Sequence, residues 1–285
     1  MSPFMFSKWS PGGNTTLLFT APGLAPAQQA ELARQALDPS VLGGEQAGFV
    51  DRQARSLRMA GGEFCVNASR AVGALLASEE ERASTAAAPP KSDQAARTVH
   101  RYEISVSGWQ SPVRLLVRGG FPLWQVEAVL RLPEILMECR EDGICLVRLP
   151  GICHLLLDAR IHGHPEDCRA AAALLRRRYS LEQEDAVGVI WWQVLQGQLD
   201  MLPLVHVRDT RTDYLESACG SGALALALAR NRFNTSGDKK FSIMQPGGSP
   251  LDVRLFSEDG DALAGVDGPV ALVADGQVWL PDGAI

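Results

Sequence analysis

The spacing of apolar residues along the chain switches repeatedly between the period of a strand and the period of a helix. Helical spacing, rich in alanine and leucine, predicts helices over residues 25–37, 67–76, 166–178 and 222–230. Short apolar runs predict strands over residues 46–53, 56–59, 99–107, 113–118, 123–130, 144–148, 153–158, 187–193, 204–207, 253–256, 270–274 and 277–280. Residues 78–96 are first charged and then rich in alanine and proline, which predicts a surface loop.

The predicted elements form an approximate internal repeat. Each half of the chain combines many short strands with one apolar helix of small residues, a pattern typical of an α+β protein. We place the seam between the halves at Gly119 and Gly120. This gives an N-terminal domain over residues 1–119 and a C-terminal domain over residues 120–285, whose last strand can return to pack on the first domain.

Composition restricts the classes of partner. The chain has 46% hydrophobic and 21% charged residues, as an ordinary globular protein does, and its formal net charge is −6. This charge argues against nucleic acid or an anionic membrane as the partner. There is no apolar run of roughly 18 residues, and the first 14 residues do not resemble a secretory signal. We therefore expect a cytoplasmic protein whose six cysteines are free thiols.

Two segments of similar sequence each carry a cysteine where a helix is predicted to begin. Residues 64–71 read FCVNASRA and residues 218–225 read ACGSGALA. The first turn of a helix presents unpaired backbone N–H groups and the positive end of the dipole, which favours a thiolate and binds anions. We therefore expect Cys65 and Cys219 to face one anionic substrate.

Two facing thiols can move a proton from one face of a carbon atom to the other. One thiolate removes the α-proton of an amino acid while the second thiol donates a proton from the opposite side. Backbone N–H groups at residues 66–67 and 220–221 would bind the α-carboxylate and stabilise the charge that grows on it. A pyridoxal enzyme needs a Schiff-base lysine, but all four lysines fall in segments expected to be exposed or terminal, so we expect no cofactor.

The motifs resemble those of the diaminopimelate epimerase family over most of the chain. Residues 65–70 and 218–222 are similar to its two signature motifs, and residues 8–14 to its N-terminal substrate loop. Residues 151–154 are similar to its Gly-Asn-Pro-His segment. Arg211, eight positions before Cys219, stands where the family carries a substrate-binding arginine.

This resemblance implies two domains, each a set of mostly antiparallel strands wrapped around a central helix, with the active site in the cleft between them. It also implies cofactor-independent racemisation or epimerisation of an amino acid, and a possible homodimer. Cys65 and Cys219 are then the acid/base pair. The residues that would bind the substrate are Asn14, Gln46, Val66, Asn67, Arg211, Gly220 and Ser221.

Some positions depart from the family pattern. Ile152 and Gly188 replace asparagines that contact the distal end of diaminopimelate, and Thr210 replaces a glutamate. These departures favour a different substrate. Residues 58–65 and 216–222 also resemble a branch of amino-acid racemases that includes a histidine racemase, in which Glu45, Gln46 or Glu216 could contact an imidazole ring.

Two alternative functions stay open, and the second is of another class. An isomerase of the same fold could act on another small carboxylic acid, and a non-catalytic protein could bind an amino acid without exchanging its α-proton. The remaining cysteines and histidines in residues 139–168 lack the Cys-x-x-Cys pairs of structural metal sites, so we expect no metal.

Overall fold

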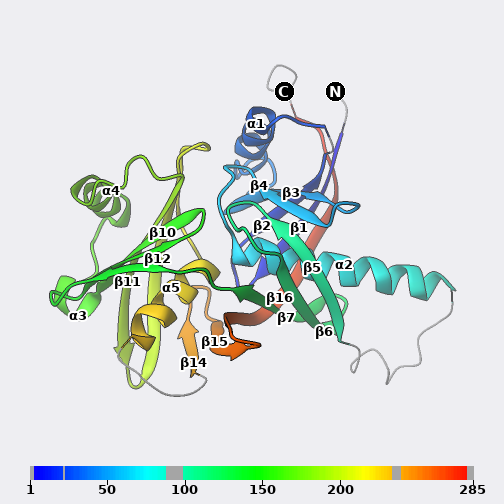
Figure 1. The fold of residues 1–285 in the computed structure, drawn as a ribbon. Helices are drawn as coiled ribbons and strands as arrows, with labels where there is room; N and C mark the ends of the chain where they lie inside the picture. Colours follow the sequence, from blue (N-terminus) through cyan, green and yellow to red (C-terminus); the bar gives the residue numbers. More distant parts are fainter. Residues whose placement is uncertain (1–2, 22, 88–98, 233–238, 281–285) are drawn as a thin grey trace.

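The computed structural model describes residues 3–21, 23–87, 99–232 and 239–280, and it consists mostly of strands (Figure 1). One long series of paired strands runs through the whole molecule. It surrounds two helices, α2 (Val66–Ala87) in the first half and α5 (Gly220–Asn231) in the second. The strands thus hold each helix in place by its apolar surface.

In the first half the strands close on themselves around α2. Along the series they are β1 (Phe4–Pro11), β2 (Thr16–Thr20), β3 (Gln46–Asp51), β4 (Ser56–Met59), β5 (His100–Val106), β6 (Val113–Gly120), β7 (Leu123–Arg131) and β16 (Asp261–Val278). The final strand β16 pairs with both β7 and β1, which closes the circle. Helix α1 (Pro26–Ala36) packs outside it, against β3.

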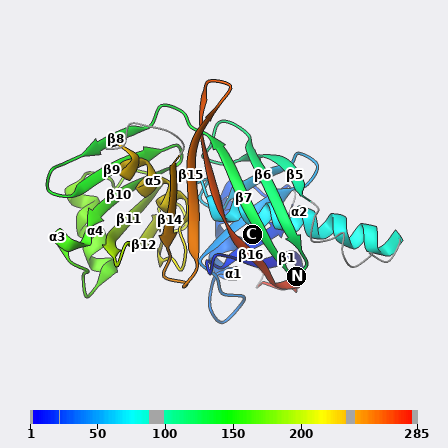
Figure 2. The ribbon, with the colours of Figure 1, turned by 90° about the horizontal axis from the view of Figure 1, so that it is seen from below.

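In the second half the strands form a curved sheet with helices on both faces. The strands are β8 (Leu136–Cys139), β9 (Ile144–Leu149), β10 (Ile152–Asp158), β11 (Ala186–Leu195), β12 (Gln198–Val207), β13 (Thr212–Leu215), β14 (Lys239–Met244) and β15 (Pro250–Glu258). Helix α5 packs against β9, β10, β14 and β15. The short helix α3 (Ala159–His162) and α4 (Cys168–Arg178) lie on the other side of the sheet (Figure 2).

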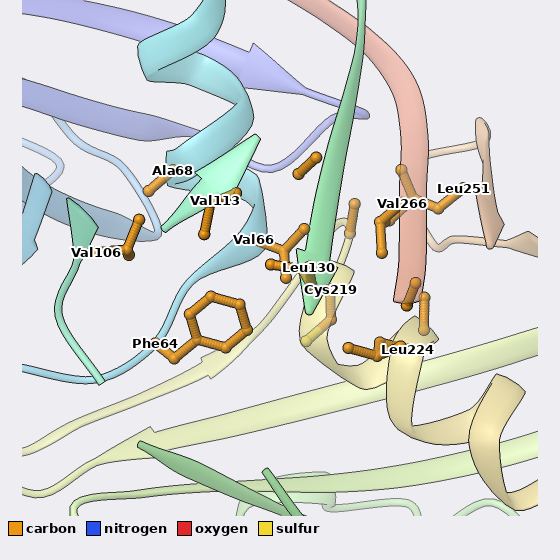
Figure 3. Close-up of a cluster of buried hydrophobic side chains, with 14 of the residues drawn as sticks. Phe64, Val66, Ala68, Val106, Val113, Leu130, Cys219, Leu224, Leu251 and Val266 are labelled. Atoms are coloured by element: carbon orange, nitrogen blue, oxygen red, sulfur yellow. The ribbon is translucent and has the colours of Figure 1, made fainter. Parts of the chain in front are cut away.

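One hydrophobic core joins the two halves. It contains the start of α2 and nearly the whole of α5, together with side chains from β5, β6, β7, β15 and β16. Figure 3 shows Val66 and Cys219 within this cluster, between Phe64 and Leu224. Small residues on α5 let the surrounding strands approach closely, because alanine and glycine add little bulk to the helix surface.

The structure confirms the four predicted helices and corrects several details. Residues 78–87 continue α2 where we predicted a loop, because glutamate, arginine and alanine are good helix formers. The other residues of that predicted loop, up to 96, lie outside the described part. Residues 8–11 end strand β1 where we expected a substrate loop. The single strand β16, which ends at Val278, contains the strand predicted over residues 270–274 and the first half of the one predicted over residues 277–280.

Two further expectations concern cysteines and domains. Cys139 and Cys145, which face each other on β8 and β9, form a disulfide, so the expectation of six free thiols is wrong for this pair. The boundary between residues 119 and 120 stays a prediction, and β7, the strand that follows it, pairs with β6. In the described residues, no helix has both the length and the apolar character to cross a membrane.

Candidate active site

The N-termini of α2 and α5 meet at the centre of the molecule. Cys65 directly precedes α2, and Cys219 is the residue before the first turn of α5. The Asn67 side-chain amide donates a hydrogen bond of 2.8 Å to the backbone carbonyl of Ala218. This bond ties the first turn of one helix to the entry of the other, and so brings the two cysteines to one place.

A small cavity lies between these two helix ends. Its volume is about 30 Å³. Its walls come from both halves of the chain and are formed by Glu45, Gln46, Glu63, Phe64, Cys65, Asn67, Ile152, Val205, Val207, Tyr214, Glu216, Cys219, Gly220 and Ser221.

The Cys65 thiol is held by two hydrogen bonds, one that it donates and one that it accepts. It donates a hydrogen bond of 3.0 Å to Oε1 of Gln46, and the backbone N–H of Ala68 donates to its sulfur at 3.3 Å. Burial raises the pKa of this thiol, the negative charge of Glu216 raises it further, and the Ala68 N–H opposes the rise. We expected the helix start to lower the pKa of this thiol. That expectation is wrong in this structure, because burial outweighs the effect of the N–H groups.

The Cys219 thiol has an acidic neighbour. Burial raises its pKa well above the usual value, and Glu216, which accepts a hydrogen bond from the thiol, raises it further. The backbone N–H of Cys219 donates to Oε1 of Gln245 at 2.9 Å, which fixes the start of α5. Glu216 is therefore placed to receive the proton that the Cys219 thiol loses when it becomes a thiolate.

A buried histidine supports the first turn of α5. Nε2 of His154 lies 3.0 Å from Oγ of Ser221, and that hydroxyl lies 3.7 Å from the sulfur of Cys219. Burial lowers the pKa of His154 to about 3, so the ring is neutral at neutral pH. A β-carbon at Gly188 would lie 2.1 Å from Nδ1 of this ring. Gly188, noted above as a departure from the family pattern, is thus what makes room for His154.

Three glutamates line the cavity, and no lysine or arginine is among its lining residues in the described part of the chain. Glu45 is bonded through both carboxyl oxygens, to Asn14 and to Ser217. Burial raises the pKa of Glu63 to about 7 and that of Glu216 to about 8. Glu63 is not among the predicted site residues. The signal that could have identified it is its position, two residues before Cys65.

The predicted site residues divide into three groups. Gln46, Asn67, Gly220 and Ser221 line the cavity with the two cysteines. Val66 lies in the core beside it. The other two predicted residues, Asn14 and Arg211, lie outside the lining of the cavity.

Asn14 and Arg211 do not line the cavity. Asn14 is fully buried behind Gln46, whose side-chain amide donates to its Oδ1 at 2.7 Å. Arg211 is exposed on the turn before β13 and lines a different hollow, between that turn and α1. The structure therefore brings Asn14 to the site through Gln46 and keeps Arg211 away from it.

Comparison with known proteins decides the family. The family model described as the histidine racemase CntK N-terminal domain matches residues 4–279. The chain belongs to this family. A histidine racemase of Fusobacterium nucleatum (strain ATCC 23726) is 26% identical over 279 residues, which cover 96% of this chain and 97% of that protein. A histidine racemase of Staphylococcus aureus (strain Mu50) is 22% identical, over 96% of this chain and 97% of its own length. The chain is an isomerase of the racemase and epimerase class.

Solved structures show the same fold. A hydroxyproline epimerase from Agrobacterium vitis superposes with a TM-score of 0.63 at 14% identity, over 99% of this chain and 94% of that one. A phenazine biosynthesis protein of the PhzF family from Bacillus anthracis has a TM-score of 0.62 at 8% identity, covering 98% of this chain and all of that one. The mostly-strand architecture is thus shared with epimerases and PhzF-type proteins.

Proposed function

We propose that this protein is a cofactor-independent histidine racemase in which Cys65 and Cys219 act as the two acid/base groups. The observation that carries the proposal is the convergence of two helix N-termini, each with a cysteine at its start, on one cavity. The family supports histidine as the substrate, because the matching relatives are histidine racemases. The two-domain diaminopimelate epimerase-like fold, with its active site between the halves, is part of the same proposal.

The substrate carboxylate would lie against the helix ends. No lysine or arginine lines the cavity in the described residues, so the carboxylate would rely on neutral donors, among them the backbone N–H groups of the first turns at Asn67, Gly220 and Ser221. They would also stabilise the negative charge that moves onto the carboxylate when the α-proton leaves. The acidic side chains of the cavity suit the positively charged amino group.

The proton transfer itself needs one thiolate and one thiol. A thiolate on one side takes the α-proton and becomes a thiol, and the carbanion then takes a proton from the thiol on the opposite side, which becomes a thiolate. Each turnover therefore exchanges the roles of Cys65 and Cys219, and the reverse reaction starts from the state that the forward reaction leaves. Glu216, hydrogen-bonded to the Cys219 thiol, would accept its proton when the working thiolate forms.

A buried cation, Arg70, supports the Cys65 thiolate. The guanidinium of Arg70 is fully buried and donates to Oδ1 of Asn67 at 3.2 Å. It lies near enough to Cys65 that a thiolate there raises the pKa of Arg70, which burial lowers to about 10. The attraction is mutual, so this buried cation favours the charged form of the cysteine.

The proposal is tested by following histidine in deuterium oxide. The purified, reduced protein is incubated with L-histidine, and in parallel with other L-amino acids including diaminopimelate. Chiral chromatography and mass spectrometry then measure the D-isomer and the deuterium at the α-carbon. We expect inversion and labelling of histidine. Binding of histidine without exchange of its α-proton would support a non-catalytic binding protein. Inversion of another amino acid in place of histidine would identify that amino acid as the substrate.

A further inference from the structure

Two carboxyl groups in the wall of the cavity each have an oxygen that nothing in the described chain uses. Oε2 of Glu63 and Oε2 of Glu216 are both buried and have no hydrogen-bond partner among the described residues. Each of the two side chains is only 7% exposed. A buried acceptor without a donor costs free energy, so such an atom in a binding cavity points to a group that the bound ligand supplies.

The two carboxyl groups enter the cavity from opposite halves of the molecule. Glu63 lies in the loop that leads to α2, and its Oε2 would lie 2.8 Å from a β-carbon at Gly61, so glycine there leaves room for the carboxyl group. Glu216 lies between β13 and α5. The negative charge of Glu63 also raises the pKa of Glu216, which places the two groups within electrostatic reach of each other.

Part of the wall around these acids is apolar. Phe64, Ile152, Val205 and Val207 line the same cavity, and the Phe64 ring stacks on Trp109 with centroids 4.4 Å apart. A ligand group suited to this environment is flat, fills space between apolar side chains and carries N–H donors at its edge. An imidazolium ring has that shape and two N–H donors, and each donor could meet one open carboxyl oxygen.

Two other candidates for recognising an imidazole are already occupied. Glu45 is held through both oxygens by Asn14 and Ser217, across the two halves. Gln46 accepts from Cys65, and its amide donates to Asn14. Neither side chain is free to turn to a ligand without breaking these bonds.

We infer that Glu63 and Glu216 form a paired acceptor site for the side chain of the substrate, one carboxyl group for each ring nitrogen. The inference rests on the proposed function for the identity of the ring as imidazole. It assigns a recognition role to Glu63 and gives Glu216 a second role beside its contact with Cys219.

The test compares histidine with thienylalanine, whose ring is similarly flat but has no N–H group. Calorimetry measures the dissociation constants of both amino acids for the wild type, Glu63→Gln, Glu216→Gln and the matched control Glu103→Gln, whose side chain is exposed on β5. We expect each of the first two variants to weaken histidine binding by about 10- to 100-fold, the loss that follows when a hydrogen bond to a charged group is removed. Binding of thienylalanine should change little, and the control should match the wild type.

The outcome separates the inference from the proposed function. If both variants keep the wild-type ratio of histidine to thienylalanine affinity, the paired acceptor site is wrong, whether or not the wild type racemises histidine. If selective binding is lost in the variants but the wild type exchanges no α-proton of histidine, the recognition site stands and the racemase proposal fails. Circular dichroism of each variant shows that it is folded.

Discussion

Gly220, the first residue of α5, sits against Val66, the first residue of α2. A β-carbon at Gly220 would lie 2.8 Å from the β-carbon of Val66 and 3.0 Å from Oδ1 of Asn67. Real β-carbons essentially never show a contact of 2.8 Å, so glycine is what allows the two helix ends to touch. The separation of the two thiols therefore depends on a residue that carries no side chain.

Gly220→Ala should move the two helix starts apart. Overpacking of a tight contact costs about 1–3 kcal/mol of stability, and a small shift of one thiol relative to the other should lower kcat by at least about 10-fold. The control is Gly276→Ala on β16, where the nearest atom to a new β-carbon is 3.8 Å away on Phe6. Equal activity of the two variants would show that the contact at Gly220 does not set the geometry of the site.

Glu45→Ala should weaken the connection between the halves. The carboxyl group of Glu45 accepts from the Asn14 amide and from the backbone N–H and hydroxyl of Ser217. Removing it leaves buried donors unpaired, at about 1–3 kcal/mol each. Urea unfolding should show this loss, and Glu103→Ala, an exposed position, should show almost none. A midpoint equal to that of the control would contradict the structural role of Glu45.

Stability should fall between about pH 4.5 and about pH 7 because of Glu63. Burial raises its pKa from 4.5 to about 7, so the protonated form is favoured in the folded state. The contribution of this group to the free energy of unfolding is complete below its pKa in the unfolded chain, 4.5. It is lost as the pH rises through about 7, and the total loss is about 3 kcal/mol. Glu63→Gln stays neutral, so its free energy of unfolding should fall less than that of the wild type between pH 5 and pH 9. Parallel pH profiles would refute the burial of an uncharged carboxyl group.

Stability should also fall on the acid side because of His154. Burial lowers its pKa from 6.5 to about 3, so the folded state holds the neutral ring. The contribution of this ring to the free energy of unfolding is complete above its pKa in the unfolded chain, 6.5. It is lost as the pH falls toward about 3, and the loss reaches about 3 kcal/mol by about pH 4.5. His154→Asn should therefore unfold with a smaller loss between pH 7 and pH 4.5 than the wild type. An equal loss in both proteins would place the acid sensitivity elsewhere.

Sequence reasoning found the helices and the paired cysteines because these features are local. A cysteine followed by small residues and an apolar repeat predicts a helix start, and the structure places helix starts at residues 66 and 220. The spacing between Arg211 and Cys219 could not show that the Arg211 side chain is exposed. Arg211 lies in a tight turn, with a φ of 54°, and this turn depends on the fold. The open oxygen of Glu63 could not be predicted either, because its burial depends on the fold around it. That the protein forms a homodimer and acts in the cytoplasm stays a prediction.

The most direct test of the two-thiol account follows deuterium at low conversion. Wild-type protein is incubated with L-histidine in deuterium oxide and stopped when only a small fraction has inverted. If one thiol removes the proton and the other donates, the D-histidine formed carries deuterium while the remaining L-histidine stays unlabelled. Cys65→Ser and Cys219→Ser should each abolish inversion while remaining folded. Product that keeps its original proton, or substantial inversion by either serine variant, would contradict the account.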